Sequence, residues 1–185
     1  ADQTGPDSTV METPAEPEPV LQNYEYSIQV GSYRFLPQAL EARNRLIQGG
    51  LPDVFVTPVI LDSLGSWNRL YVGCYASSEQ ADTALARILP ELRKSAAGAE
   101  SSSQPIKRRT PWTINLGDFS PSDSLETLRT RLANFDIPSY TIQISADSTG
   151  VKKPRLYVGA FEDQEQAVYI RTRLFNIGVA GSIEE

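Results

Sequence analysis

The folded part of the chain opens with a strict alternation of apolar and polar residues. In the string YSIQVGSY, Ile28 and Val30 occupy one face of an extended backbone and polar residues occupy the other. This alternation is typical of a β-strand with one buried face. Apolar residues then recur at helical spacing between residues 36 and 48, and the pair Gly49-Gly50 ends the run. A strand followed by a helix is therefore expected.

Two further strands and a second helix follow. Residues 53–61 are rich in Val, Ile and Phe, and residues 68–75 alternate between apolar and polar side chains. Helical spacing returns after an N-cap at Ser77 or Ser78, with apolar positions from Ala81 to Leu92, although Pro90 favours a kink or an early end there. The alternation in residues 68–75 predicts inward side chains for Leu70, Val72 and Cys74 and outward side chains for Arg69 and Tyr71.

The same pattern occurs twice along the chain. The string RLYVG stands at residues 69–73 and again at residues 155–159, 86 positions later. A glycine in the first strand keeps this offset, because Gly31 in YSIQVGSY matches Gly117 in WTINLGDF. Each RLYVG is followed by an aromatic residue and then by EQA. Two landmarks at one spacing indicate a duplicated unit of about 75 residues, not one large domain.

The repeat divides the chain into segments. Residues 1–23 hold four prolines and five acidic residues but no basic one, which predicts an extended, disordered linker. Residues 24–94 form the first expected unit and residues 111–185 the second, with a linker over residues 95–110. Within that linker, residues 104–109 leave two alternatives open: a fourth strand of the first unit, or a connector.

Each unit is expected to fold in the order β-α-β-β-α-β. Each strand has only one apolar face, so both helices must cover the same side of the sheet. The predicted fold class is therefore α+β, with two tandem split-βαβ units of the ferredoxin or RNP-like kind. Each unit would contain a four-stranded antiparallel sheet with two helices on one face and an open second face.

Composition excludes several kinds of chemistry. The 185 residues include no histidine and one cysteine, Cys74, so histidine-dependent catalytic arrangements and intrachain disulfides are excluded. No converging carboxylate pair or metal-ligand cluster is evident, and we expect no enzyme activity, no metal and no cofactor. The net charge of -6 argues against a nucleic-acid partner. No apolar run is long enough to span a membrane, so membrane attachment is expected only through an anchor outside this chain.

The repeated strings resemble those of the sporulation-related repeat (SPOR) domain. That family has a first strand close to V-Q-V-G-S-F and a later strand close to R-V-x-V-G-P-F, followed by a helix that contains alanine. The corresponding strings here are YSIQVGSY and RLYVGCY, the latter followed by SSEQA. The resemblance covers residues 24–94 well and residues 111–185 less well.

The resemblance implies a bacterial cell-envelope protein in the periplasm. SPOR domains bind peptidoglycan, prefer glycan strands stripped of stem peptides, and in many cases mark division septa. The implied partners are glycan strands and an envelope or division protein, and the implied binding surface is the open sheet face with its rim. The residues at the family's binding positions are Gln29, Ser32, Tyr33, Arg69 and Tyr71 in the first unit and Asn115, Arg155 and Tyr157 in the second.

These residue types suit a sugar polymer. Amides and hydroxyls exchange hydrogen bonds with sugar hydroxyls, aromatic rings pack on sugar faces, and arginine binds the carboxylate of muramic acid. The second unit departs from the family pattern, because Asn115 replaces the glutamine and Asp118 replaces the serine. The first unit is therefore the better candidate binder.

Other interpretations stay open. Arg69 and Arg155 could pair with surface acids, and Tyr33 could belong to the edge of the core. The alternative function is a protein-interaction or assembly scaffold, built from tandem SPOR-like repeats that no longer bind glycan. Single-stranded nucleic-acid binding shares this strand order, but the basic-aromatic string that it needs is absent.

Overall fold

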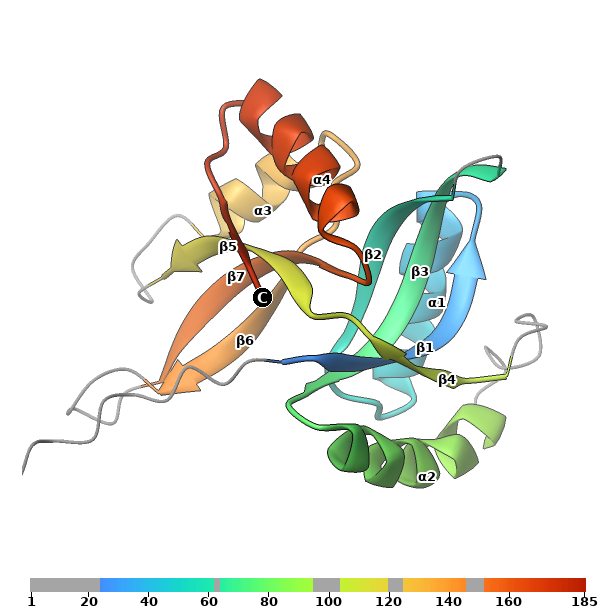
Figure 1. The fold of residues 1–185 in the computed structure, drawn as a ribbon. Coiled ribbons are helices and arrows are strands. Elements are labelled where there is room, and N and C mark those ends of the chain that lie inside the picture. The colour runs from blue at the N-terminus through green and yellow to red at the C-terminus, as the bar shows by residue number, and fades with distance from the viewer. Residues whose placement is uncertain (1–23, 62–63, 95–103, 120–124, 146–151) are drawn as a thin grey trace, which may run out of the picture.

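Two halves of the same element order make up the protein (Figure 1). The expected linker over residues 1–23 lies outside the part of the chain that is described. The computed structural model describes residues 24–61, 64–94, 104–119, 125–145 and 152–185.

The helices and strands follow the sequence pattern closely. Strand β3 begins earlier than predicted, because its first residue, Gly65, pairs with Leu61 at the end of the preceding strand. The first unit comprises β1 (Tyr26–Tyr33), α1 (Leu36–Gln48), β2 (Val54–Leu61), β3 (Gly65–Tyr75), α2 (Ser78–Lys94) and β4 (Ile106–Arg109). The second comprises β5 (Trp112–Asp118), α3 (Leu125–Ala133), β6 (Tyr140–Ser145), β7 (Lys152–Phe161), α4 (Gln164–Asn176) and β8 (Ser182–Glu184).

Both sheets are antiparallel and share one topology. Their strand orders are β2-β3-β1-β4 and β6-β7-β5-β8. Strand β4 pairs with β1 and completes the first sheet, so this segment is not a mere connector. The predicted fold class, α+β with two tandem four-stranded units, is confirmed.

Each unit has its own hydrophobic core between its sheet and its two helices. Alternate strand residues supply one side of each core, and one face of each helix supplies the other. Helix α2 continues past Pro90 to Lys94, so the proline does not end it. The first core includes Ile28, Leu70, Val72, Ala39, Leu46 and Ile88. The second includes Ile114, Leu156, Val158, Leu132, Ile170 and Leu174.

Two β-bulges recur at equivalent places in the two units. The register shifts twice between β1 and β3 and at the two matching positions between β5 and β7. One bulge lies at the glycine of RLYVG, where φ is +68° for Gly73 and +70° for Gly159. Because a bulge adds one residue to its strand, the side chains beyond it change faces. Cys74 therefore lies away from the helices while Tyr75 packs against the core, and the inward direction predicted for Cys74 is wrong.

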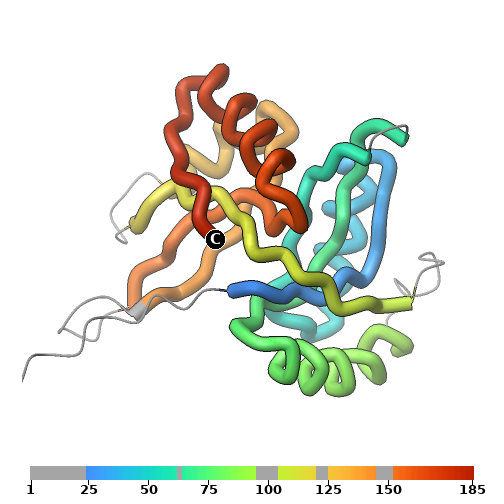
Figure 2. Tube along the Cα trace, in the orientation of Figure 1, coloured from blue at the N-terminus to red at the C-terminus, as the bar shows by residue number. Residues whose placement is uncertain are grey.

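A connection of two residues joins the sheets. Only Thr110 and Pro111 separate β4 from β5, and both are buried. Thr110 donates its backbone N–H to the Glu25 carbonyl oxygen at 2.7 Å and its hydroxyl to Ser27 Oγ at 3.2 Å. Figure 2 shows the chain passing from β4 straight into β5. So short and well bonded a connection restricts how the two units can be oriented.

Candidate functional site

The sheet faces that point away from the helices pack against each other. The buried side chains at this contact are Phe55 and Tyr71 from the first unit and Tyr140, Tyr157 and Ala160 from the second. We call this set the inter-sheet layer. The rings of Phe55 and Tyr140 stack with their centroids 4.2 Å apart, close to the separation of favourable aromatic pairs.

This contact closes the face that the sequence predicted to be open. Tyr71 is 0% exposed, and Gln29 and Tyr157 are each 7% exposed. The expectation of an open sheet face is wrong for this arrangement, because the second unit covers it. The physical reason is that both faces carry aromatic side chains that no helix reaches, and burying them against each other is favourable. Glycan binding by these residues stays a prediction.

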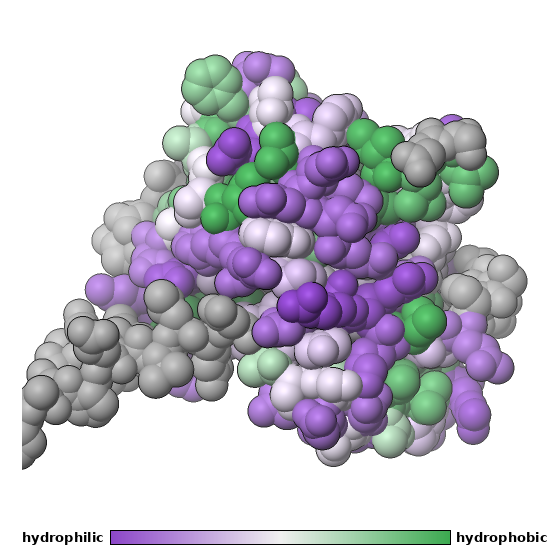
Figure 3. Space-filling view, in the orientation of Figure 1, coloured by the Kyte–Doolittle hydropathy of each residue, from purple (hydrophilic) through white to green (hydrophobic). Residues whose placement is uncertain are grey.

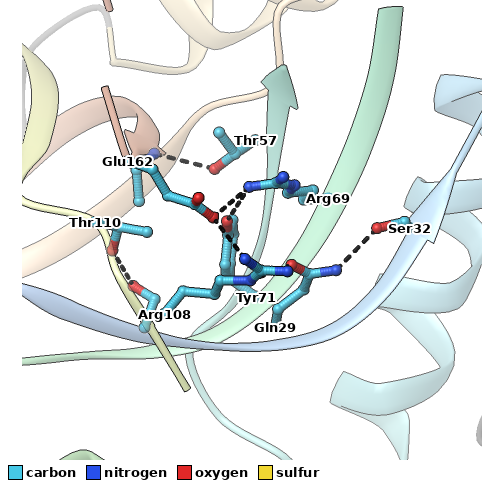
Figure 4. Close-up of polar contacts among 10 residues, drawn as sticks. Gln29, Ser32, Thr57, Arg69, Tyr71, Arg108, Thr110 and Glu162 are labelled. Atoms are coloured by element: carbon cyan, nitrogen blue, oxygen red, sulfur yellow. Dashed lines mark hydrogen bonds and ion pairs between the residues drawn. The ribbon is translucent and has the colours of Figure 1, made fainter. Parts of the chain in front are cut away.

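A polar cluster lies along the edge of the inter-sheet layer (Figure 4). Arg69 Nη1 donates to Glu162 Oε1 at 2.5 Å, and Arg108 Nη1 lies 3.4 Å from the same oxygen. Glu162 belongs to the second unit, whereas both arginines belong to the first. The two units are therefore joined by a carboxylate held between two guanidinium groups. We call Gln29, Ser32, Arg69, Arg108 and Glu162 the rim cluster.

Hydrogen bonds connect the other members of the rim cluster. Arg108 Nε donates to Gln29 Oε1 at 3.0 Å, and Gln29 Nε2 donates to Ser32 Oγ at 2.9 Å. The amide of Gln29 is thus held in one orientation. Burial alone lowers the pKa of Arg69, but its bond to Tyr71 and the charge of Glu162 outweigh burial and raise the pKa overall. Its guanidinium is a permanent cation at the covered face.

The equivalent residues of the second unit are arranged differently. Arg155 donates to both carboxylate oxygens of Asp118, at 2.5 and 3.1 Å. That pairing holds the pKa of Asp118 below its usual value. Asn115 donates to Glu184 at 2.7 Å. The second unit therefore neutralises its own arginine, whereas the arginine of the first unit is neutralised by the other unit.

One end of the predicted surface stays accessible. Ser32 is exposed and Tyr33 is half-buried, with its ring against the first core. Beside them, the Arg34 guanidinium carbon lies 5.7 Å from the centre of the Trp67 ring, within cation–π range. Figure 3 shows apolar residues near the upper ends of β2 and β3 and hydrophilic residues across the middle of the molecule. Ser32, at this end of the first sheet, is therefore in contact with solvent.

A cleft of about 440 Å³ also lies between the units, bordered by α1 and α3. Arg43 and Arg129 both line it. Arg43 Nε donates to the Val54 carbonyl oxygen at 2.9 Å, and Arg129 pairs with Glu126 at 3.1 Å. None of the predicted binding residues is among those that line this cleft, so it is a weaker candidate than the rim cluster.

Cys74 packs against the inter-sheet layer and is the sole cysteine of the chain. Burial raises the pKa of its thiol from 9.0 to about 12. The folded protein thus keeps a proton that the unfolded chain loses near pH 9, so its stability falls as pH rises from about 9 toward 12. Thiol reactivity depends on thiolate and on access. Because Cys74 is half-buried against this layer, a rate of thiol labelling above that of the folded wild type would report that the two sheets have separated.

Sequence reasoning missed two members of the rim cluster. Arg108 lies in the basic run of residues 107–109, which signals a surface cation but not its position beside Gln29. Glu162 follows the second RLYVG string closely, but only the packing of the two units brings it to Arg69. Arg69 and Arg155 do pair with acids, as one open interpretation held, and both pairs are now identified.

Comparison with protein-family models matches the SPOR domain twice, over residues 22–98 and 109–183. The chain therefore belongs to the SPOR domain family and carries two tandem copies of it. SPOR domains are binding modules that occur in bacterial cell-envelope proteins and bind peptidoglycan. No curated protein and no solved structure gives a significant match.

The described residues also bear on membranes and metals. None of the helices among them is both long and apolar enough to cross a membrane. The same residues contain no group of three or more potential metal ligands.

Proposed function

We propose that this protein is a non-catalytic, peptidoglycan-binding protein of the bacterial periplasm that recognises peptide-stripped glycan strands. The observation that carries the proposal is the double match to a family of peptidoglycan-binding modules. Its partners would be glycan strands and an envelope or division protein, and any membrane anchor would lie outside this chain. Binding at division septa follows from the same proposal.

The chemistry of the first unit supports a sugar ligand. The Gln29 amide and the Ser32 hydroxyl lie 2.9 Å apart and can share the hydroxyl and acetamido groups of one sugar. Arg69 supplies a cation for the carboxylate of a muramic acid residue. Tyr33, which is half-buried at the accessible end, supplies aromatic surface for a sugar ring, and Tyr71 would do so only once the second unit no longer covers it. We propose that a glycan strand first meets this surface at its exposed Ser32 end.

We assign the second unit a weaker role in binding. Asn115, Arg155 and Tyr157 stand at the matching positions, but Arg155 holds Asp118 of its own unit through two hydrogen bonds, whereas Arg69 holds Glu162 of the other unit through one. A glycan carboxylate would have to displace Asp118 from a bidentate contact. If both units did bind one polymer, their linkage would raise the overall affinity.

The proposal is tested by co-sedimentation of the whole chain with purified sacculi, intact and amidase-stripped, at two salt concentrations. Enrichment on stripped sacculi with a modest salt dependence is expected. Gln29→Ala should weaken binding by roughly threefold to tenfold, because it removes neutral hydrogen bonds. Gln38→Ala, on the exposed side of α1, is the matched control and should bind like the wild type. Absence of pelleting at both salt concentrations would sink the proposal, and a steep loss with salt would indicate a polyanion binder.

One observation favours a second candidate, an assembly scaffold. The inter-sheet layer buries one sheet face of each unit, as expected if the repeats serve mainly to pack on each other. A scaffold would ignore sacculi and co-purify with a specific envelope protein. The same sedimentation experiment therefore separates the two candidates.

A further inference from the structure

Glu162 stands where a ligand carboxylate would stand. Its carboxylate contacts both arginines of the rim cluster, at 2.5 Å from Arg69 and 3.4 Å from Arg108. Its side chain is 30% exposed, and those of Arg69 and Arg108 are 12% and 34% exposed. Two guanidinium groups that converge on one carboxylate oxygen form an anion site, here filled from within the chain.

The contact that delivers Glu162 is reinforced by its neighbours. The backbone N–H of Ala160 donates to Thr57 Oγ1 at 3.0 Å, and Thr57 is 0% exposed. Ala160 itself lies in the inter-sheet layer. The end of β7 is therefore held against β2 and β3 of the first unit, and this holds the carboxylate over Arg69. The position of Glu162 follows from the packing of the units and is not that of a freely moving surface side chain.

We infer that Arg69 and Arg108 form a carboxylate-binding pair for the muramic acid residues of the glycan, and that Glu162 occupies this pair in cis and competes with the ligand. This inference rests on the proposed function. Glycan binding then includes release of Glu162 from both arginines and a local opening of the inter-sheet layer over Gln29 and Tyr71, which the two-residue connection limits to a small displacement of the second unit. Arg108, which no sequence motif singled out, becomes a specificity-determining residue for anionic glycan.

The test substitutes Glu162→Gln, which keeps the shape of the side chain but removes the charge that competes with the ligand. The matched control is Glu165→Gln, an exposed acid in the first turn of α4 that takes no part in the rim cluster. Binding to peptide-stripped sacculi is measured for both variants and the wild type. In parallel, the rate at which Ellman's reagent labels Cys74 reports separation of the sheets without any ligand.

Glu162→Gln is expected to bind stripped sacculi roughly fivefold more tightly, the change in affinity that loss of a partly buried ion pair produces. In this variant Ellman's reagent should also label Cys74 several times faster. Glu165→Gln should match the wild type in both assays. Stripped glycan added to the wild type should also speed labelling of Cys74. Equal binding by wild type and Glu162→Gln overturns the inference while leaving the proposed function standing. If neither the wild type nor any variant binds stripped sacculi, the proposed function and the inference both fail, whatever the rates of Cys74 labelling.

Discussion

Arg69→Ala is expected to reduce binding to peptide-stripped sacculi by roughly tenfold or more, which is what the loss of a charge-assisted hydrogen bond costs. The substitution removes the cation that would hold a glycan carboxylate, and it also frees Glu162. If Arg69 were only a clamp between the units, its removal would uncover the sheet face and binding would rise. The direction of the change therefore separates a ligand role from a structural one.

The duplication supplies the matched control for this experiment. Arg155 occupies the same place in the second RLYVG string, but its guanidinium is engaged by Asp118 within its own unit. Arg155→Ala is expected to change binding by about threefold or less, the effect of a weakly contributing contact. Sedimentation isotherms of the two variants give the comparison, with circular dichroism to establish folding. Equal losses in both variants would assign the site to both units, and no loss in either would remove arginine from the binding mechanism.

Gly159→Ala is expected to lower the free energy of unfolding by roughly 2–5 kcal/mol, from backbone strain and overpacking together. At φ +70° any residue with a Cβ is strained, and the added Cβ would lie 2.1 Å from Cζ of Phe161. Phe161 is 0% exposed, so its ring cannot move away without leaving the second core. Urea denaturation of the whole chain measures the effect.

A second glycine separates the effect of backbone strain on stability from the effect of the clash with Phe161. Gly50 has φ +90°, but a Cβ added there would meet no other atom within 4 Å. Gly50→Ala should therefore show the backbone strain alone, about 1–2 kcal/mol. If Gly159→Ala lowers the free energy of unfolding by no more than Gly50→Ala does, a Cβ at position 159 does not clash with the ring of Phe161.

Local pattern predicted most of the fold because each unit is built from strands with one apolar face. The alternation around Ile28 and the helical spacing after Leu36 both survive in the structure. Alternation failed at Cys74, where the bulge at Gly73 reverses the side-chain direction. The alternation of apolar and polar residues does not reveal where a bulge inserts an extra residue, although the glycine that permits the bulge can be seen in the sequence.

The candidate site was less predictable, because its surroundings come from the other unit. The sequence pattern correctly placed Tyr71 and Gln29 on the sheet face away from the helices. That pattern describes one unit at a time, so it predicted that this face is open to solvent, whereas the second unit covers it. The cover comes from Tyr140, Tyr157 and Glu162, which all belong to the other unit. Sequence separation hides such contacts: Arg69 and Glu162 are 93 positions apart. The linker expected over residues 95–110 concealed this closeness as well, because residues 106–109 form β4 and only Thr110 and Pro111 separate the two sheets.

The most direct test of the account is an NMR titration of the whole chain with soluble, peptide-free glycan strands. Saturable shift changes are expected at the amides of Gln29, Ser32 and Arg69, together with changes at Glu162 as its carboxylate is displaced. Asn115 and Arg155 should change less. A spectrum that stays the same at saturating glycan would contradict glycan binding outright. Changes confined to the second unit would contradict the assignment of the site to the first.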